Sequence, residues 1–386
     1  MNRLLSLSVL AVWAALAAGM PAASQTAAPT AAKKTPYYTN AELFTTAARP
    51  FSIIKADPAL GALISPAAKL ESLGDRFGLT EGPVWMPQGE SGYLLVSDLI
   101  ANVIYKITPD HTVSVFLENA GYSGDEVNSA GAQTRRGRAH VLMIGPNGET
   151  RDSEGRLVWC AANDGTIVRL EKDGTRTILA SGYQGKRFDG PNDLVMRSDG
   201  AIYLTDGDWG LRGGRNSPLK QLGWEGVYLI KDGVVTLLLT GEALGGFPNG
   251  VTLSPDEKHL YLNAGFKKMM RYDVAPDGTI SNGLVFFEAP PAGFGDGMKT
   301  DVLGNLYSTG GAGPGVVRIT SPQGKYLGQI NLPVYGTEPK RQICGTNLAF
   351  GDPDGRGLYI TACEAVYKIR LKVPGVLPGH AAVKSR

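Results

Sequence analysis

Six polar residues with oxygen-bearing side chains recur along this chain at intervals of 45 to 66 residues. They are Glu81, Asn147, Asn192, Asn249, Asp296 and Asn347. Two carboxylates and four amides offer only oxygen, which suits a hard divalent cation: Ca²⁺ first, with Mg²⁺ or Mn²⁺ as alternatives and Zn²⁺ as a further one. Polar residues at strand starts often only cap turns and bond backbone groups, and for any single Asn this structural interpretation is the stronger one. The metal interpretation is stronger for Glu81 and Asp296, because carboxylates near a buried axis need a compensating charge.

A regular repeat must position these six residues, which we call the head residues. Each is followed by a short apolar run, a turn and a strand-like segment. The position eight residues after the head is Gly in five copies and Glu257 in the other, which suits a turn that requires positive φ. The chain holds 51 Gly in 386 residues, about 13% against a usual ~7%. We therefore predict an all-β fold, a six-bladed β-propeller with four-stranded blades, in which all heads meet at one end of the central channel.

The ends of the chain differ from the repeats in composition. Arg3, an apolar run and small residues near Ser24 have the layout of a secretory signal peptide, with a retained N-terminal anchor as the alternative. No other stretch is apolar enough to span a membrane, so the mature protein is expected to be secreted or periplasmic, without a membrane span. The predicted organisation is a signal peptide at 1–24, a flexible lead-in at 25–69, the catalytic propeller at 70–372 and a C-terminal tail at 373–386. Leu70–Phe77 could supply an outer strand that closes the ring against the C-terminal strands.

Export makes a disulfide possible. Cys344 and Cys363 flank two strand-like runs around the turn Pro353–Gly355, and in a hairpin they would lie nearly opposite each other. The pairing stays a hypothesis, with two free thiols as the alternative. Cys160 is expected to be a small buried residue.

Five short motifs in this order carry a family resemblance: Glu81–Trp85, Gly190–Asp193, Pro248–Gly250, Gly295–Met298 and Thr346–Phe350. On these motifs the chain resembles the senescence marker protein/gluconolactonase/luciferin-regenerating-enzyme-like family over residues 70 to 372. The resemblance implies a six-bladed propeller that holds one divalent metal in its channel and hydrolyses lactones.

The resemblance also implies roles for individual residues. Glu81, Asn249 and Asp296 match the metal ligands, and Asn192 matches a residue that contacts substrate or completes the metal shell. Asp296 further matches the acid/base position, and Asp193 is a neighbouring carboxylate that some members use.

Two further residues are assigned to substrate binding. Asn147 is a head residue, and Trp209 is expected either to form an apolar wall or to pack within a blade. The chain departs from the family at Gly190, where animal members carry Arg, and in the segment Thr205–Gly210. These departures put a sugar-acid substrate in doubt.

The sequence leaves more than one function open. The leading hypothesis is an exported, metal-dependent lactonase that acts on a small-molecule lactone. The alternatives are a non-catalytic propeller that binds a ligand or protein around a structural metal, and another hydrolytic or isomerising reaction on this fold. A net charge of +2 argues against nucleic acid as a partner. The chain has no G-x-S-x-G sequence and only four His, which argues against a serine-hydrolase triad and a His-rich metal site. Oligomeric state is not predicted.

Overall fold

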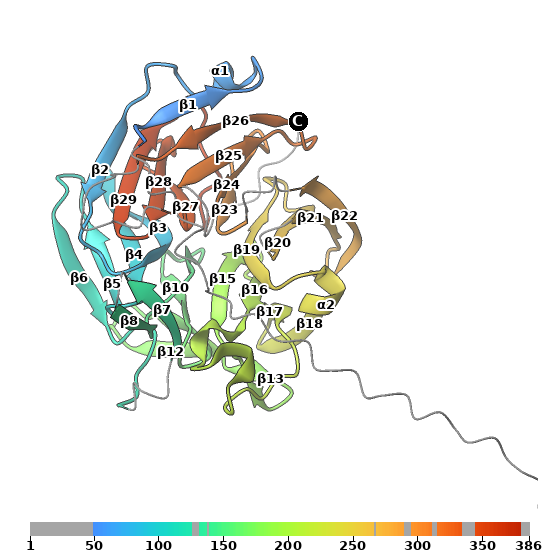
Figure 1. The fold of residues 1–386 in the computed structure, drawn as a ribbon. Coiled ribbons are helices and arrows are strands. Elements are labelled where there is room, and N and C mark those ends of the chain that lie inside the picture. Colours follow the sequence, from blue (N-terminus) through green and yellow to red (C-terminus); the bar gives the residue numbers. More distant parts are fainter. Residues whose placement is uncertain are drawn as a thin grey trace, which may run out of the picture. The chain divides into compact units, whose positions relative to one another are not determined.

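The computed structural model describes residues 49–125, 131–136, 139–265, 268–288, 295–310, 315–333 and 344–379. The expected signal peptide and most of the expected lead-in lie outside these residues. In the described part the chain forms six antiparallel sheets arranged around a central axis, which confirms the predicted β-propeller (Figure 1).

Each blade runs from an inner strand at the channel to an outer strand at the rim. Blade 1 consists of β3 (Thr80–Gln88), β4 (Ser91–Asp98), β5 (Val103–Ile107) and β6 (Val113–Glu118). Blade 2 consists of β9 (Glu149–Arg151), β10 (Leu157–Ala161), β11 (Thr166–Leu170) and β12 (Arg176–Ala180). Blade 3 consists of β15 (Pro191–Met196), β16 (Ile202–Asp206), β17 (Gly226–Lys231) and β18 (Val234–Thr240).

The second half of the ring repeats this order. Blade 4 consists of β19 (Pro248–Leu253), β20 (His259–Ala264), β21 (Lys268–Val274) and β22 (Ile280–Glu288). Blade 5 consists of β23 (Met298–Thr300), β24 (Leu306–Thr309), β25 (Val316–Thr320) and β26 (Tyr326–Asn331). Blade 6 consists of β27 (Asn347–Gly351), β28 (Gly357–Ala362) and β29 (Ala365–Arg370), joined at its edge by β2 (Leu70–Gly74).

Smaller elements lie outside this pattern. Between blades 1 and 2 is the hairpin β7 (Ala132–Arg136) and β8 (Ala139–Met143). A second hairpin, β13 (Gly182–Tyr183) and β14 (Lys186–Arg187), precedes blade 3. The 3₁₀ turns η2 (Asp208–Gly210) and η3 (Gly214–Asn216) lie in the loop between β16 and β17 of blade 3. The α-helices are α1 (Leu60–Leu63) and α2 (Gly241–Leu244). None of the helices in the described residues has the length and apolar character needed to cross a bilayer.

The turn prediction holds in all six blades. The residue eight positions after each head has positive φ, between 57° and 87°. It is Gly in five blades, and Glu257 adopts the same left-handed conformation at φ 57° in blade 4.

The hydrophobic core is divided among the blade junctions. Each of the six junctions between neighbouring blades contains its own cluster of buried side chains. At the junction of blades 1 and 2, Val84 and Leu95 pack with Trp159, which is fully buried. Fully burying a large apolar side chain contributes about 1.5–3 kcal/mol, so stacking the blades stabilises the ring.

The N-terminal part of the described chain closes the ring. Strand β2 pairs with β29, with Leu70 opposite Ile369, which confirms the predicted closure. Strand β1 (Ser52–Lys55) adds a fifth strand to blade 5 by pairing with β26. Leu60 and Leu63 of α1 are buried in the core between blades 5 and 6. The predicted flexible lead-in is therefore wrong for residues 52–64, because apolar side chains within this Ala/Pro-rich segment pack on the propeller.

The expected C-terminal tail is also partly packed. The backbone of Gly375 donates to Gly355, and that of Val376 to the Thr300 carbonyl at 3.0 Å. Farther on, Arg151 Nη2 donates to the Pro378 carbonyl at 2.6 Å. Residues 374–379 therefore cross from blades 5 and 6 to blade 2 at the channel end opposite the head residues. The rest of the tail lies outside the described residues.

Candidate functional site

The head residues meet in two hydrogen-bonded runs at one end of the channel. The Asn147 amide donates to Asn192 Oδ1 at 2.7 Å, and the Asn192 amide donates to Asn249 Oδ1 at 2.8 Å. The Asn249 amide in turn bonds the carboxylate of Asp296. In the second run, the Asn347 amide donates to Glu81 Oε2 at 3.2 Å. The sequence prediction that these side chains converge is correct, and we call this group the polar ring.

Burial sets the electrostatics of the polar ring. Glu81 and the four Asn residues are 2–7% exposed to solvent, whereas Asp296 is only partly buried. Removal from water, and repulsion from Asp193, raise the pKa of Glu81 to about 7. Removal from water, followed by repulsion from Glu81 and Asp193, raises the pKa of Asp296 well above its usual value. The positive charge of Lys299 lowers the pKa of Glu81, but it is the weakest of the influences on that carboxyl group.

This donor set fits a divalent cation. Glu81 is buried beside the partly buried Asp296, and a cation between the two carboxylates would supply the missing positive charge. Amide oxygens that accept one hydrogen bond keep a second lone pair for a metal. The described residues contain no cluster of three or more His, Cys, Asp or Glu suited to a metal, so the fit depends on Glu81 and Asp296 together with the amides of Asn192 and Asn249.

Glycine next to the head residues allows the inner strands to approach one another. A Cβ at Gly82 would lie 2.1 Å from the Asn147 carbonyl oxygen, and one at Gly250 would lie 2.1 Å from that of Asp296. Gly148 and Gly297 also follow head residues directly, and a Cβ there would lie 2.7 Å from Asp193 Oδ1 and 2.1 Å from the Asn347 side chain, respectively. A side chain at these positions would push the neighbouring heads apart, so the glycines fix the width of the polar ring.

Polar side chains on the second strands of blades 1, 4 and 5 bond the backbone at or next to the head residue of the following blade, and the sequence interpretation missed them. Ser97 Oγ donates to the Asn147 carbonyl at 2.7 Å, and the Asn263 amide donates to that of Asp296. Thr309 Oγ1 likewise donates to the Thr346 carbonyl at 2.8 Å. The signal in the sequence was a small polar residue 13 to 16 positions after each head, with Cys160 as the exception.

Glu149 is a further buried carboxylate that the sequence interpretation missed. It is 3% exposed, Ser97 hydrogen-bonds its Oε1, and its Oε2 has no hydrogen-bond partner among the described residues. Burial raises the pKa of Glu149 well above its usual value. Its position two residues after Asn147 was the available signal.

The two candidate acid/base residues differ in their surroundings. Asp193 is 2% exposed, and its two oxygens accept the backbone N–H groups of Leu194 at 2.9 Å and Val251 at 3.4 Å. Asp296 accepts from Asn249 and is partly exposed. Asp296 is thus the better placed of the two to exchange a proton with a bound molecule.

Trp209 packs at the channel end that carries the polar ring and not inside a blade. Its ring lies edge-on to Phe247, with centroids 5.8 Å apart, and it contacts a small apolar cluster with Leu79 and Leu99. Leu79 lies two residues before Glu81, and Phe247 two residues before Asn249. Trp209 therefore does not pack within a blade, and its role as an apolar wall beside substrate stays a prediction.

The family departure at Gly190 has a steric reason. A Cβ there would lie 2.3 Å from the Gly210 backbone nitrogen, so no side chain fits. The Gly190 N–H donates to Asp206 at 2.8 Å, which holds the loop after β16 against the start of β15.

That loop encloses a second acidic group, which we call the blade-3 acidic cluster: Asp189, Asp206, Asp208 and Glu225. Lys220 lies among them, forms an ion pair with Asp189 and acts electrostatically on the other three. Arg215 lies 3.8 Å from Asp208 and 3.5 Å from Glu225. In this cluster the positive charges that pair with the carboxylates come from the side chains of Lys220 and Arg215.

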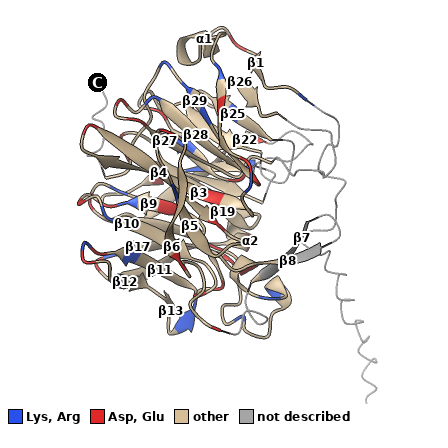
Figure 2. Cartoon of the chain, turned by 90° about the vertical axis from the view of Figure 1, so that its left-hand side faces the viewer, with Lys and Arg blue, Asp and Glu red and all other residues tan. Residues whose placement is uncertain are grey.

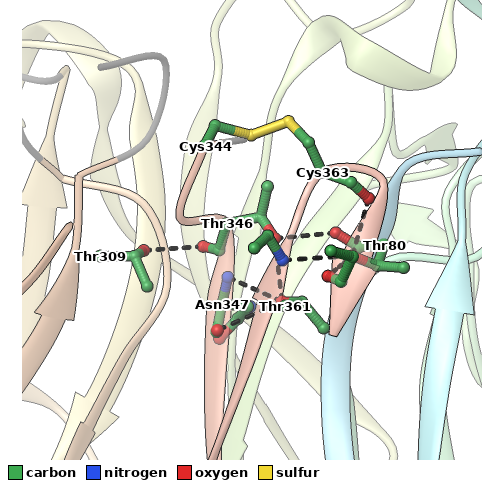
Figure 3. The surroundings of a disulfide bond; sticks show 9 residues. Thr80, Thr309, Cys344, Thr346, Asn347, Thr361 and Cys363 are labelled. Carbon is green, nitrogen blue, oxygen red and sulfur yellow. Dashed lines mark hydrogen bonds between the residues drawn. A yellow bond between two sulfur atoms is a disulfide. The ribbon is translucent and has the colours of Figure 1, made fainter. Parts of the chain in front are cut away.

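The predicted disulfide is present at the junction of blades 6 and 1. Cys344 and Cys363 are bonded, with their Cα atoms 5.4 Å apart (Figure 3). Cys160 is a buried free thiol, as expected.

The fold and the polar ring together define a six-bladed β-propeller with carboxylates and amides gathered at one end of its channel. The pattern of the SMP-30/Gluconolactonase/LRE-like region matches residues 79–364. The chain belongs to this family.

Individual relatives agree with this assignment. The chain is 32% identical over 337 residues to a gluconolactonase from Zymomonas mobilis, covering 84% of this chain and 87% of that protein. It superimposes on a gluconolactonase from Xanthomonas campestris with a TM-score of 0.65 at 26% identity, covering 84% of this chain and 98% of that one. A calcium-binding protein, regucalcin, from Agrobacterium tumefaciens shares the fold at 16% identity, with a TM-score of 0.60 and coverage of 82% and 98%.

Proposed function

We propose that this protein is an exported, metal-dependent lactonase that hydrolyses a lactone, or a related cyclic ester, to a hydroxy acid. The observation that carries the proposal is the polar ring, in which Glu81 and Asp296 are gathered with amide groups around one point. Family membership and the similarity to two gluconolactonases support the reaction class. A propeller that only binds a ligand has no need of paired carboxylates in its channel.

The residues of the ring divide the work of hydrolysis. Asp296 would take a proton from the attacking water as its oxygen bonds to the lactone carbonyl carbon. The C–O bond of the lactone ring then breaks, and Asp296 returns the proton to the alkoxide oxygen that leaves. Asn192 and Asn147 would orient the substrate through their amides, with Trp209 as an apolar wall beside it.

The cation would be held by Glu81, Asn249, Asp296 and Asn192. A divalent cation at such a site supplies polarisation of the lactone carbonyl. Ca²⁺ is proposed first because all of the donors are oxygen atoms, and a calcium-binding protein shares the fold.

The disulfide supports export. Disulfides persist in oxidising compartments and are rare in the cytosol. The Cys344–Cys363 bond therefore agrees with a secreted or periplasmic location, which detection of the protein in a periplasmic or culture fraction would test.

The activity is tested with a lactone panel that includes glucono-δ-lactone, δ-valerolactone and an alkyl-substituted γ-lactone. Acid release is followed by pH-stat, with chelator-treated protein before and after addition of Ca²⁺, Mg²⁺, Mn²⁺ or Zn²⁺. We expect hydrolysis that disappears with chelator and returns with one cation. Activity that survives complete metal removal would contradict the metal dependence, and no hydrolysis of any lactone with any cation would contradict the lactonase proposal.

A further inference from the structure

The disulfide lies next to two members of the polar ring that belong to different blades. Cys344 is three residues before Asn347 of blade 6. The carbonyl oxygen of Cys363 accepts two hydrogen bonds from Thr80 of blade 1, from its N–H at 2.7 Å and its hydroxyl at 2.8 Å. Thr80 directly precedes Glu81, so the disulfide joins the backbone leading to Asn347 with the backbone that holds Glu81 (Figure 3).

Thr346 completes this connection. Its hydroxyl donates to the Thr80 carbonyl at 2.8 Å and lies 2.8 Å from the hydroxyl of Thr361. The Thr361 hydroxyl accepts the backbone N–H of Asn347 at 2.9 Å. Thr346 is 5% exposed and Thr80 and Thr361 are fully buried, so water cannot replace these bonds (Figure 3).

The relative position of blades 6 and 1 decides one contact in the ring. The Asn347 amide donates to Glu81 Oε2 at 3.2 Å, across the junction where the two ends of the chain meet in one blade. Cys363 has a left-handed backbone, with φ 57°, which a non-glycine residue adopts only when neighbouring bonds hold it. The disulfide and Thr80 are the bonds that hold this corner.

We propose that Thr346 is a positioning residue for Glu81 and Asn347, and that the Cys344–Cys363 disulfide keeps it in place, so that a dithiol reductant weakens cation binding. This inference rests on the proposed cation site. In the redox step the dithiol is oxidised to its cyclic disulfide, the protein S–S bond breaks, and the two electrons and two protons end on the thiols of Cys344 and Cys363.

The first experiment measures Ca²⁺ affinity by calorimetry on the chelator-treated full chain. Thr346→Val removes the hydroxyl and keeps the branched shape, whereas Thr346→Ser keeps the hydroxyl. Thr300→Val is a matched control, because the Thr300 hydroxyl donates to the Leu253 carbonyl of the preceding blade at 2.8 Å, is also buried and lies away from the polar ring. Because supporting bonds around ligands typically change metal affinity 10–100-fold, we expect about tenfold weaker binding in Thr346→Val, with Thr346→Ser close to wild type.

The outcomes separate this proposal from the proposed function. If wild type binds Ca²⁺ and Thr346→Val binds it equally well, the positioning role is wrong and the cation site stands. An equal loss of affinity in Thr300→Val would reduce the effect to general destabilisation and overturn the positioning role. If wild type binds none of the four cations, the cation site itself is wrong, and the positioning role falls with it.

The second experiment tests the disulfide directly. Wild type is titrated with Ca²⁺ before and after treatment with a dithiol, and thiol counting confirms that two thiols appear. The double variant Cys344→Ser/Cys363→Ser is titrated in the same way, with circular dichroism to confirm that it folds. We expect the dithiol to weaken binding about tenfold in wild type and to leave the already weakened double variant unchanged. Unchanged affinity in reduced wild type would overturn the role of the disulfide.

Discussion

Two groups of buried carboxylates in this molecule are built in opposite ways. In the blade-3 acidic cluster, Lys220 and Arg215 lie within the group and pair with its members. In the polar ring, Glu81 and Asp296 repel each other, and no ion pair joins either of them to a Lys or Arg of the described residues. In Figure 2 the ribbons of the inner strands β3 and β9 are red where acidic residues occur, and these strands carry Glu81 and Glu149.

The difference is the reason why we propose a functional role for the polar ring and a structural role for the blade-3 acidic cluster. A carboxylate cluster that contains its own cations can hold a loop together, although burial and repulsion among its members still raise the pKa of Asp206 and Asp208. A carboxylate cluster without a cation costs stability unless one binds from solution, which agrees with the cation site proposed for the polar ring.

The largest effect is expected at Asp296. Asp296→Asn removes the proposed base and a ligand, and we expect kcat/KM for a lactone to fall about 10²–10⁴-fold. The free energy of unfolding of the cation-free protein should rise, because one of two repelling carboxylates is gone. Steady-state kinetics and denaturant unfolding check both effects.

Asp301→Asn is the control for this variant. Asp301 is a fully buried carboxylate of the same blade that accepts backbone N–H groups from Leu303 and Asn305. This variant should lose stability and keep its activity. Equal activity losses in the two variants would remove the special role of Asp296.

The next effect is expected at Lys220. Lys220→Met leaves Asp189 buried without its partner, and we expect a loss of about 3–5 kcal/mol in the free energy of unfolding. Lys231→Met is the control, because Lys231 pairs with Asp199 at 3.0 Å on the surface, and such pairs contribute about 0–1 kcal/mol. Similar losses in the two variants would mean that the acidic cluster does not depend on an internal cation.

Cation binding should stabilise the protein by a smaller amount. At a Ca²⁺ concentration of about 100 times Kd, we expect the free energy of unfolding to rise by about 2.7 kcal/mol. Thermal unfolding with and without Ca²⁺ measures the rise, which should persist in Lys220→Met and vanish in Asp296→Asn. A rise retained in Asp296→Asn would place the cation elsewhere.

The smallest effect is the pH dependence of the blade-3 acidic cluster. Burial and repulsion from Asp189 raise the pKa of Asp206 to about 7, and burial and repulsion from Glu225 raise that of Asp208 to about 6, from usual values of 3.8. Both groups hold protons more tightly in the folded state, so their contribution to stability is full below pH 4 and is lost as the pH rises toward 7. Asp206→Asn should flatten the dependence of the unfolding free energy on pH over this interval. An unchanged slope would contradict the assignment.

The repeat explains why so much of the fold and site could be predicted. A head residue, a turn and a strand recur six times, and a closed propeller places equivalent positions at one end of the channel. The convergence of Glu81, Asn249 and Asp296 follows from this symmetry. The roles assigned to these residues remain predictions.

The parts that were missed break the repeat or depend on packing between blades. Ser97 and Thr309 act through the backbone of the next blade, and no local pattern shows which carbonyl they reach. The lead-in was interpreted from its Ala and Pro content, although Leu60 and Leu63 complete a core that exists only once blades 5 and 6 are formed. The blade-3 acidic cluster could not be predicted because its partner Lys220 follows Asp189 by 31 residues and meets it only in the folded chain.

The C-terminal segment covers only one of the two ends of the channel. Because residues 374–379 lie across the end of the channel away from the polar ring, a partner attached at this segment would sit behind the propeller. Immobilising the protein through this segment would leave the polar ring turned toward the solution, which suits a supported enzyme.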